Sequence, residues 1–342
     1  MLQDPKASAD WLSRLRDAEA QLNGAILGQS RAIRLILLSV LARGHVLLAG
    51  DVGTGKTTLL RAVARAIGGP SARVEGTVDL LPTDLIYDAH LDAGGKPRIE
   101  PGPALSQGED LSIFFFNEIN RARPQVHAML LRMMAERSLT AFRREYRFPH
   151  LQVFADRNQI ERDETFELPA AARDRFAMEI AVTVPAERDD RITLAFDTRF
   201  HDTDALIDTI APGLLPYQGL NALAAQIQAD VHASPVLQRY VFDLCDALRD
   251  PVRTGLAIEG ADMARLVRGG VSPRGMQALV RLARACAWAE GRDAVLPQDI
   301  RTVFQPVMAH RTFLGPAYEA RREVLVPALI HAAFDTIPVP AE

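Results

Sequence analysis

The residues best suited to chemistry lie at positions 50–57, where the chain reads Gly-Asp-Val-Gly-Thr-Gly-Lys-Thr. The spacing G-x-x-x-x-G-K-T is typical of a loop whose backbone N–H groups converge on the phosphate oxygens of a nucleotide. In such a loop Lys56 would pair with the β- and γ-phosphates, and the Thr57 hydroxyl would be a ligand of Mg²⁺. The pattern therefore predicts a site for ATP and Mg²⁺. Its predicted nucleotide-binding residues are Gly50, Asp51, Val52, Gly53, Thr54, Gly55, Lys56, Thr57 and Thr58.

The flanking residues favour this interpretation over a glycine-rich turn that binds nothing. Val46–Ala49 is a short apolar run that can form a buried strand, and Thr58–Ile67 carries apolar residues at helical spacing. A strand, the loop and a helix in this order place the phosphates at a helix N-terminus, where the helix dipole favours negative charge.

A catalytic carboxylate is expected at the end of the apolar run Leu111–Phe116, which is typical of a central parallel strand covered on both faces. Glu118 follows this run and is placed to orient the water that attacks the γ-phosphate. The alternative is a carboxylate that merely caps the start of a helix.

Asn117 stands before Glu118, at the position where an aspartate usually helps to hold Mg²⁺. Its amide oxygen can accept a hydrogen bond from a metal-bound water but carries no negative charge. Thr57 and Asn117 are thus the predicted metal-site residues, with weaker Mg²⁺ binding or slower turnover. We expect Asn117→Asp to lower the Mg²⁺ concentration needed for half-maximal turnover.

Three further polar residues have positions that suit phosphate chemistry, although each also has a plain structural interpretation. Asn158 ends the next apolar strand, where it could report a γ-phosphate or simply form a turn. Arg175 precedes a predicted strand and could reach the phosphate of a neighbouring subunit or form a surface ion pair. Arg173 is the other candidate for the residue that reaches this phosphate. Arg274 lies in the first turn of a helix that begins with Ser-Pro, where a cation suits a facing phosphate or is simply exposed to solvent.

These residues need a scaffold in which strand ends meet. Between residues 46 and 182 apolar strands alternate with helices, which predicts a doubly wound parallel sheet of the α/β class. Short strands or a hairpin are expected within 73–103, and a hairpin is expected at 138–148. The later elements are expected to be helices at 188–196, 220–230, 236–249, 273–290, 297–310 and 318–334, the last broken near Pro327. We therefore predict a nucleotide-binding domain at 1–205, a small all-α domain at 215–310 after a linker at 212–216, and a C-terminal helix and tail at 311–342.

Composition limits the classes of protein and of partner. The 342 residues suit two domains, and 48 % hydrophobic with 24 % charged residues is typical of a soluble globular chain. The net charge of −4 gives no general case for nucleic-acid binding, although seven arginines gather within residues 121–147. Cys245 and Cys286 have no metal-ligand spacing and suit a reducing compartment. The sequence shows no apolar run long enough to span a bilayer and no signal-peptide pattern, so we expect a cytoplasmic protein.

Taken together, these motifs resemble those of the AAA+ ATPases, and most closely the MoxR group, relatives of the magnesium-chelatase ATPase subunit. The resemblance covers roughly residues 22–310. It rests on the stretches GQSRAI (28–33), HVLLAGDVGTGKT (45–57), VDLLPTDL (78–85), FNEINRARPQVHAMLLRMM (116–134), SLTAFRREYRF (138–148), FELPAAARDRF (166–176) and GGVSPRGMQALVRLARA (269–285).

The resemblance implies an AAA+ core with a P-loop, followed by a helical lid, and it implies roles for single residues. Asn158 would be the first sensor, Arg175 the arginine finger acting in trans, and Arg274 the second sensor from the lid. Members of the group commonly form hexameric rings and use ATP to remodel or activate partner proteins, often with a von Willebrand factor A-type partner. Several help to insert metal ions into enzymes, and maturation of methanol dehydrogenase is one role in the group.

The sequence departs from the group at several positions. Asn117 replaces the magnesium-binding aspartate, and residues 156–159 read Asp-Arg-Asn-Gln where the group has a sequence closer to Thr-Gln-Asn-Pro. Ala170 stands where an acidic residue is usual, and the tip of the 138–148 hairpin carries Arg143 and Arg144 without glycine. These departures bear on hydrolysis more than on nucleotide binding, so we expect an ATPase that is slow.

Three functions remain open at this point. The whole set of motifs favours an ATP-driven remodeller, whereas Asn117 also suits a ring component that binds ATP as an assembly switch and hydrolyses little. A nucleic-acid motor would use the hairpin arginines, with Phe142 and Tyr146 between them. One basic hairpin is weak evidence for nucleic-acid binding. ATPase stimulation by DNA or RNA that declines with salt would identify such a motor.

Overall fold

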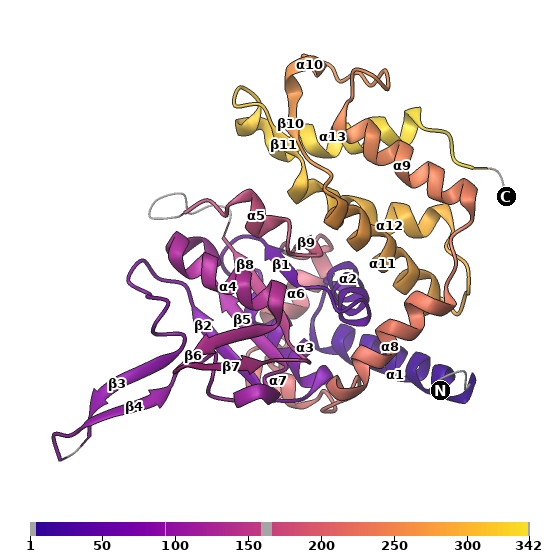
Figure 1. The fold of residues 1–342 in the computed structure, drawn as a ribbon. Helices are drawn as coiled ribbons and strands as arrows, with labels where there is room; N and C mark the ends of the chain where they lie inside the picture. Colours follow the sequence, from indigo (N-terminus) through magenta and orange to yellow (C-terminus); the bar gives the residue numbers. More distant parts are fainter. Residues whose placement is uncertain (1–4, 93, 159–165, 341–342) are drawn as a thin grey trace. The chain divides into compact units, whose positions relative to one another are not determined.

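The structure, a computed structural model, describes residues 5–92, 94–158 and 166–340 of the chain (Figure 1). The chain divides into two compact units. The first unit holds residues 1–175 and 180–223, and the second holds residues 176–179 and 224–342. None of the described helices combines the length and the apolar character needed to cross a membrane.

The core of the first unit is a five-stranded sheet in the order β2–β5–β8–β1–β9. Its strands are β1 (Val46–Ala49), β2 (Ser71–Glu75), β5 (Ile113–Asn117), β8 (Gln152–Arg157) and β9 (Met178–Ala181). The pairs β2–β5, β5–β8 and β8–β1 are parallel, so the carboxyl ends of these strands meet at one end of the sheet. Every residue of β1 and β5 is buried, as their continuous apolar runs predict. The predicted parallel α/β sheet is confirmed.

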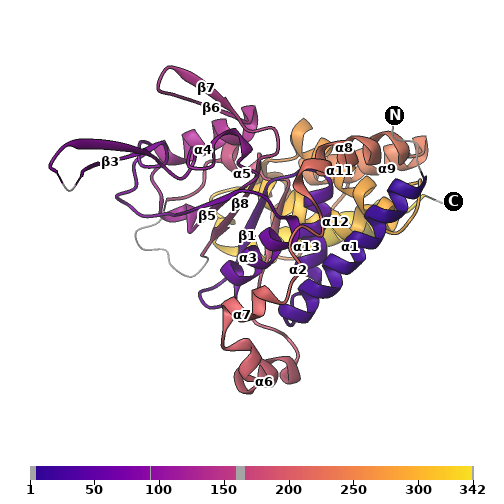
Figure 2. The same ribbon diagram turned by 90° about the horizontal axis from the view of Figure 1, so that it is seen from below.

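Helices lie on both faces of this sheet, and Figure 2 shows α4 on one side and α3 on the other. The helices of the first unit are α1 (Pro5–Ala25), α2 (Ser30–Leu41), α3 (Lys56–Ile67), α4 (Pro124–Glu136), α5 (Ala170–Arg173), α6 (Arg188–Phe196) and α7 (Thr203–Asp208). From Leu35 to Leu41 every residue of α2 is buried, because its apolar side chains occupy all sides of the helix. α2 is therefore part of the core rather than a surface helix.

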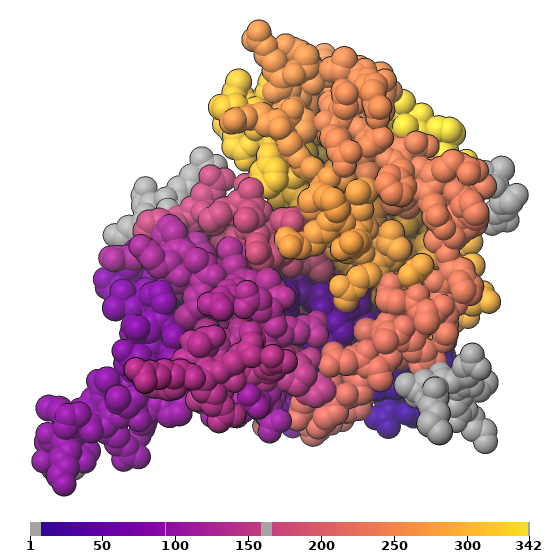
Figure 3. Space-filling model, viewed as in Figure 1, coloured from indigo at the N-terminus to yellow at the C-terminus, as the bar shows by residue number. Residues whose placement is uncertain are grey.

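Two hairpins extend from the first unit, as the sequence predicts. One consists of β3 (Tyr87–Leu91) and β4 (Pro97–Pro101), and the other of β6 (Ser138–Ala141) and β7 (Arg144–Arg147). The β3–β4 hairpin projects away from the body of this unit (Figures 1 and 3). The rings of Tyr87 and Phe142 lie 5.8 Å apart, centroid to centroid, so the two hairpins touch. Because the sequence offers no glycine at the β6–β7 tip, Phe142 and Arg143 themselves take positive φ values of 51° and 59°.

The predicted linker at 212–216 is packed against the first unit. The N–H of Gly213 donates to the carbonyl of Arg65 at 2.9 Å, and the N–H of Leu215 donates to that of Ala66 at 2.9 Å. The side chain of Leu215 is fully buried. The division between the two units falls further along the chain, within α8 (Tyr217–Asp230). The domain limits at 205, 215 and 310 remain predictions.

The second unit is built mainly of helices, as predicted. They are α9 (Pro235–Arg249), α10 (Met263–Leu266), α11 (Pro273–Ala289), α12 (Pro297–Met308) and α13 (Arg322–Thr336). α11 packs along α12. The unit also holds a short antiparallel ribbon of β10 (Val267–Gly269) and β11 (Phe313–Leu314), whose pairing contains an irregularity. The sequence does not predict this ribbon, because strands this short show no alternating pattern.

α13 runs through Pro327, so the predicted break at this residue is wrong. A proline inside a helix removes one backbone hydrogen bond, which here would join residue 327 to the carbonyl of Glu323. Leu325, Leu329 and Ile330 of the same helix are buried. Burial of these side chains stabilises the helix by more than the lost bond costs, so the helix continues.

Candidate nucleotide-binding site

The loop between β1 and α3 has the backbone geometry that a phosphate site needs. Gly53 and Gly55 have φ values of 77° and 85°, a region that residues with a side chain rarely adopt. Gly50 has no room for a side chain, because a Cβ there would lie 2.1 Å from the carbonyl oxygen of Val182. The backbone thus requires both glycines of the predicted pattern, Gly50 and Gly55, and also Gly53 within it.

Lys56 lies across this loop. Its Nζ donates to the carbonyl oxygens of Gly50 at 2.9 Å and Asp51 at 2.8 Å, and the side chain is buried. The Oγ1 of Thr54 donates to the same carbonyl of Asp51 at 2.9 Å. α3 begins at Lys56, and no described side chain caps its N-terminus, so the first N–H groups can bind an anion. An ammonium group beside a helix N-terminus fits a nucleotide phosphate.

Asn117 ends β5 and is buried. With its amide oxygen turned toward Arg73 of β2, this oxygen accepts hydrogen bonds from Nη2 at 2.6 Å and from Nε at 3.0 Å. Asn117 lies opposite Glu75 in the β2–β5 register, two residues beyond Arg73. The amide oxygen therefore faces a guanidinium group, which makes it a poorer ligand for a second cation. Arg73 was not predicted as a site residue, because nothing in the sequence shows that β2 and β5 are neighbours.

Glu118 follows Asn117 in the left-handed region, with φ of 50°. Its N–H donates to Oδ1 of Asp156 at 2.6 Å. Its Oε2 accepts from Nη1 of Arg121 at 3.0 Å, and the side chains of this pair are 30 % and 38 % exposed. Since an exposed ion pair contributes little free energy, the Glu118 carboxylate can exchange Arg121 for a water molecule.

Asp156 lies on β8 opposite Leu48 of β1, and it is 4 % exposed. Burial raises the pKa of its carboxyl group. The N–H of Glu118 and the charges of Lys56 and Arg73 act in the opposite direction, whereas the charge of Glu118 adds to the increase in the pKa. The sequence shows Asp156 merely as a departure from the group, because it does not show what the side chain meets.

Asn158 follows β8 and is buried. Its N–H donates to Oδ1 of Asn120 at 3.4 Å, and Nδ2 of Asn120 donates to the Asn158 carbonyl at 3.3 Å. Asn120 belongs to the 3₁₀ turn Ile119–Arg121 that follows Glu118. Asn120 therefore ties the segment that carries Glu118 to the strand end that carries Asn158. It was not predicted as a site residue, since an asparagine after a strand usually forms a turn.

His127 of α4 supports the same 3₁₀ turn. Its Nε2 donates to the carbonyl oxygen of Ile119 at 2.7 Å, and the ring is buried. Burial lowers the pKa of this imidazole, and the hydrogen bond to Ile119 offsets part of that decrease. The ring is therefore neutral at neutral pH.

The two candidate arginine fingers differ in exposure. Arg173 is buried, and its Nη2 lies 3.8 Å from a carboxylate oxygen of Glu167. Arg175 is half-buried, and its Nη1 donates to the carbonyl oxygen of Ala171 at 2.8 Å. An arginine that reaches a neighbouring subunit must be accessible, so the exposure of the two side chains favours Arg175.

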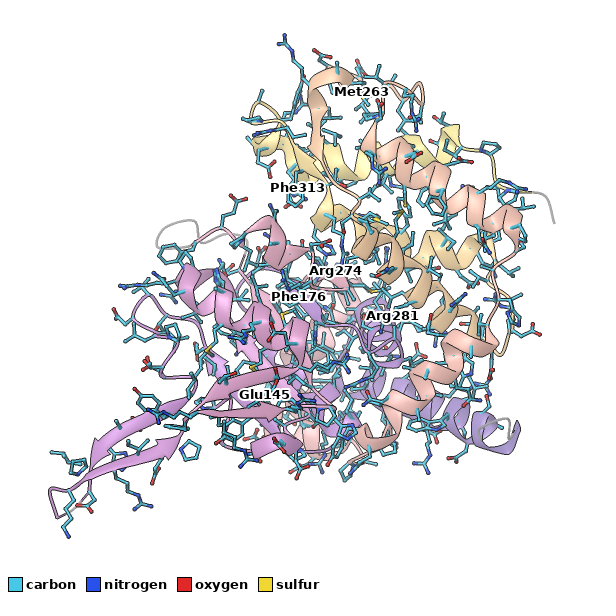
Figure 4. The ribbon with its side chains drawn as sticks, viewed as in Figure 1. Glu145, Phe176, Met263, Arg274, Arg281 and Phe313 are labelled. Atoms are coloured by element: carbon cyan, nitrogen blue, oxygen red, sulfur yellow. The ribbon has the colours of Figure 1, made fainter. Side chains whose placement is uncertain are left out.

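Arg274 belongs to the second unit, where it lies at the start of α11 (Figure 4). Ser272 caps this helix by accepting a hydrogen bond from the N–H of Gly275 at 2.9 Å, and Pro273 occupies the first helical position, as predicted. The side chain of Arg274 is exposed in the first turn. Its position is therefore consistent with a residue that meets a phosphate at its helix start.

Arg311 fills the space beside the start of α11. A Cβ on Gly275 would lie 2.7 Å from Cδ of Arg311, so the glycine makes room for this buried side chain. Arg311 donates to the carbonyl oxygens of Phe176 and Ala177, and Nε2 of His310 donates to that of Phe176 at 3.2 Å. The backbone directly after Arg175 is thus held by two side chains that the sequence analysis did not single out.

The structure brings most of the predicted site residues together. Gly50–Thr58, Asn117, Glu118 and Asn158 all lie at the carboxyl ends of β1, β5 and β8 in the first unit. Arg274 lies in the second unit.

Two sequence families match the chain. The profile described as "ATPase family associated with various cellular activities (AAA)" matches residues 45–178, and the one described as "AAA lid domain" matches residues 261–330. The first match contains the phosphate loop, Glu118, Asn158 and Arg175, and the second contains Arg274.

Similar proteins extend over nearly the whole chain. Protein MoxR of Paracoccus denitrificans is 76 % identical over 333 residues, covering 97 % of this chain and 98 % of that protein. Protein MoxR of Methylorubrum extorquens is 58 % identical, with 97 % and 96 % covered, and Chaperone MoxR1 of Mycobacterium tuberculosis is 30 % identical, with 95 % and 82 % covered. Among solved structures, a protein from Cytophaga hutchinsonii described as a candidate ATPase matches with a TM-score of 0.83 at 25 % identity, covering 98 % of both chains.

Proposed function

Since this chain belongs to the MoxR family of AAA+ ATPases, we propose that it binds ATP and Mg²⁺, hydrolyses ATP in a hexameric ring, and uses the turnover to remodel or activate a partner protein. One observation carries this proposal. Three adjacent parallel strands, β1, β5 and β8, end at one place and bring Lys56, Glu118 and Asn158 there. A lysine, a carboxylate and an amide at the end of a parallel sheet suit the transfer of a phosphoryl group to water.

We assign the residues of the first unit the following roles in ATP binding and hydrolysis. Lys56 and the N–H groups of the loop bind the phosphates, and Thr57 would hold Mg²⁺, which when bound neutralises charge on the transferred phosphoryl group. Glu118 orients the attacking water, since its carboxylate is accessible and its backbone is fixed by Asp156. Asn158 detects the γ-phosphate from the end of β8.

Two arginines complete the site in this proposal. Arg175 acts in trans on the nucleotide of the neighbouring subunit, where a guanidinium stabilises the charge of the transition state. Arg274 acts as the second sensor from the lid. Arg274 is exposed and Arg175 is half-buried, in contrast to the buried Arg173, which supports these roles.

Hydrolysis is slow in this proposal. Asn117 brings no negative charge to the end of β5, and its amide oxygen faces Arg73. The same contact favours the second candidate, a ring component that binds ATP as an assembly switch and hydrolyses little. Turnover that responds to a partner would support the remodeller over this switch.

The basic hairpin gives little support to a nucleic-acid motor. Nη2 of Arg144 lies 3.6 Å from Glu109, and its guanidinium lies over the ring of Tyr146. Nη2 of Arg147 lies 3.0 Å from Glu145. Carboxylates beside these arginines compete with nucleic-acid phosphates, so the hairpin is a weak phosphate-binding surface.

The partner in this proposal is a protein in the cytoplasm. The resemblance to the MoxR group favours a von Willebrand factor A-type protein or a metalloenzyme client such as methanol dehydrogenase, and the similarity to Chaperone MoxR1 supports a chaperone-like role. The β3–β4 hairpin is a candidate contact element, since Leu91 and Ile99 on it are 67 % and 61 % exposed. Exposed apolar side chains on a projecting hairpin suit contact with another protein.

A trapped complex tests the proposal. Glu118→Gln should bind ATP without hydrolysing it and hold the ring and its partner together, whereas Lys56→Ala should fail to bind ATP. We expect a von Willebrand factor A-type protein or a metalloenzyme to co-purify from the source cells with Glu118→Gln and not with Lys56→Ala. Recovery of nucleic acid, or the same proteins with both variants, would contradict the remodelling role.

A further inference from the structure

The end of β5 lacks the negative charge that a phosphate-bound Mg²⁺ usually meets there. Asn117 is neutral, and its amide oxygen faces the guanidinium of Arg73 at 2.6 and 3.0 Å. Mg²⁺ in phosphate sites is usually bound through one or two carboxylates together with the phosphates. The site would therefore be short of a carboxylate unless another strand supplies it.

The neighbouring strand β8 carries a carboxylate, that of Asp156, near the ends of β1 and β5. β8 lies between β5 and β1, and its register sets Ala155 opposite Phe116 and Asp156 opposite Leu48. Asp156 is thus close to the point where β1 enters the phosphate loop and β5 reaches Asn117. Asn158 follows β8 two residues after Asp156, so both residues lie at this end of the strand.

The contacts of Asp156 place its carboxyl group inside the site. Oδ1 accepts from the N–H of Glu118 at 2.6 Å, so the group lies against the end of β5. The charges of Lys56, Arg73 and Glu118 all act on it. A carboxylate that is 4 % exposed is costly to keep in a core unless a cation offsets its charge.

We propose that Asp156 supplies the carboxylate that Asn117 lacks, so that β8 rather than β5 presents the acidic group that holds Mg²⁺ beside Thr57. This inference rests on the proposed ATP-binding function and deepens it. The acidic residue of the metal site would thus lie on β8, the strand adjacent to β5. The same residue holds the backbone of Glu118 by accepting a hydrogen bond from its N–H group. Mg²⁺ binding and positioning of the catalytic carboxylate thereby depend on one side chain.

Asp156→Asn separates these two contributions. An asparagine keeps an oxygen that can accept the N–H of Glu118, while it removes the negative charge. The probe is Mn²⁺ in place of Mg²⁺, and its affinity for the complex of the full chain with ADP is measured by electron paramagnetic resonance. ADP binding in the presence of EDTA is measured alongside.

We expect Asp156→Asn to weaken Mn²⁺ binding by about tenfold or more and to leave ADP binding in EDTA unchanged. Glu75→Gln is the matched control, because Glu75 is also a carboxylate at this end of the sheet but lies on the edge strand β2. The control should leave the Mn²⁺ affinity unchanged. Equal Mn²⁺ affinity in wild-type protein and Asp156→Asn would overturn the proposal.

Asn117→Asp gives an independent test that does not depend on how Asp156→Asn folds. With Asp156 in place, we expect this substitution to change the Mn²⁺ affinity little, contrary to the gain that the sequence alone predicts. Combined with Asp156→Asn, it should restore much of the lost affinity, so that the two substitutions are strongly non-additive. A large gain from Asn117→Asp alone would show that Asp156 does not fill the role. Absence of ADP binding by the wild-type protein would overturn the proposed function as well.

Discussion

At the scale of single residues, two carboxylates in one site have different surroundings. Glu118 is 30 % exposed, and its carboxylate pairs with the partly exposed guanidinium of Arg121 at 3.0 Å. Asp156 is buried, and burial raises the pKa of its carboxyl group, whereas the charges of Lys56 and Arg73 oppose this increase. Such a difference suits different roles, with Glu118 acting on water and Asp156 on a cation.

Burial of His127 makes the free energy of unfolding depend on pH, and the direction of this dependence follows from the burial. The imidazole has a pKa near 6.5 in the unfolded chain, and burial lowers the pKa in the folded protein. Below about pH 6.5 the unfolded chain therefore binds more protons at this residue than the folded protein does. The free energy of unfolding consequently decreases as the pH is lowered. His127→Gln can still donate to the Ile119 carbonyl and should make this fall smaller. Urea unfolding of both proteins at about pH 7.5 and about pH 5.5 measures the difference, and an equal fall in both would refute the assignment.

At the scale of elements, the sequence predicts those parts whose pattern is local. The continuous apolar runs give β1 and β5, and Ser272 with Pro273 gives the start of α11. The contacts that complete the site join residues far apart in the chain. Asn120 meets Asn158 and Asp156 meets Glu118 because β8 lies beside β5, and no local pattern states that order. Asn120 and Asp156 therefore look like ordinary polar residues in the sequence, although their partners Asn158 and Glu118 were predicted as site residues.

Asn120 is the residue through which two elements of the site are held in register. Asn120→Ala leaves the buried N–H and carbonyl of Asn158 without this partner, which we expect to cost about 1–3 kcal/mol of unfolding free energy. Because Asn158 then loses its position, ATP turnover should fall while ADP affinity changes little. Asn221→Ala is the control, since Asn221 also bonds a backbone carbonyl, that of Pro149 at 3.0 Å, but lies in α8. Equal turnover in the two variants would contradict a positioning role for Asn120.

At the scale of the whole molecule, the account requires more than one copy of the chain. In the proposed mechanism each subunit supplies the phosphate loop, Glu118 and Asn158 to its own nucleotide, and Arg175 to the nucleotide of a neighbour. The match to the AAA family along residues 45–178 and the accessibility of Arg175 support this arrangement. An isolated subunit should therefore bind ATP and hydrolyse it poorly.

Mixing two inactive variants tests the trans role of Arg175. Arg175→Ala keeps an intact phosphate loop, and Lys56→Ala keeps an intact arginine, so each forms inactive rings alone. In a random mixture with equal amounts, about a quarter of the interfaces would join an intact loop to an intact arginine and regain activity. The same mixture made with Arg173→Ala in place of Arg175→Ala is the comparison. If Arg175→Ala rings are active alone, or if mixing restores no activity, Arg175 is not the finger.

The most direct test of the central claim measures ATP binding and phosphate release on the same samples of wild-type protein and Glu118→Gln. Both proteins should bind ATP with similar affinity in the presence of Mg²⁺. The wild type should release phosphate, slowly, and Glu118→Gln should release it at least about a hundredfold more slowly, because Glu118 is the carboxylate that we propose to orient the attacking water. Equal rates of phosphate release by the two proteins would contradict the claim that this strand end is a hydrolytic site.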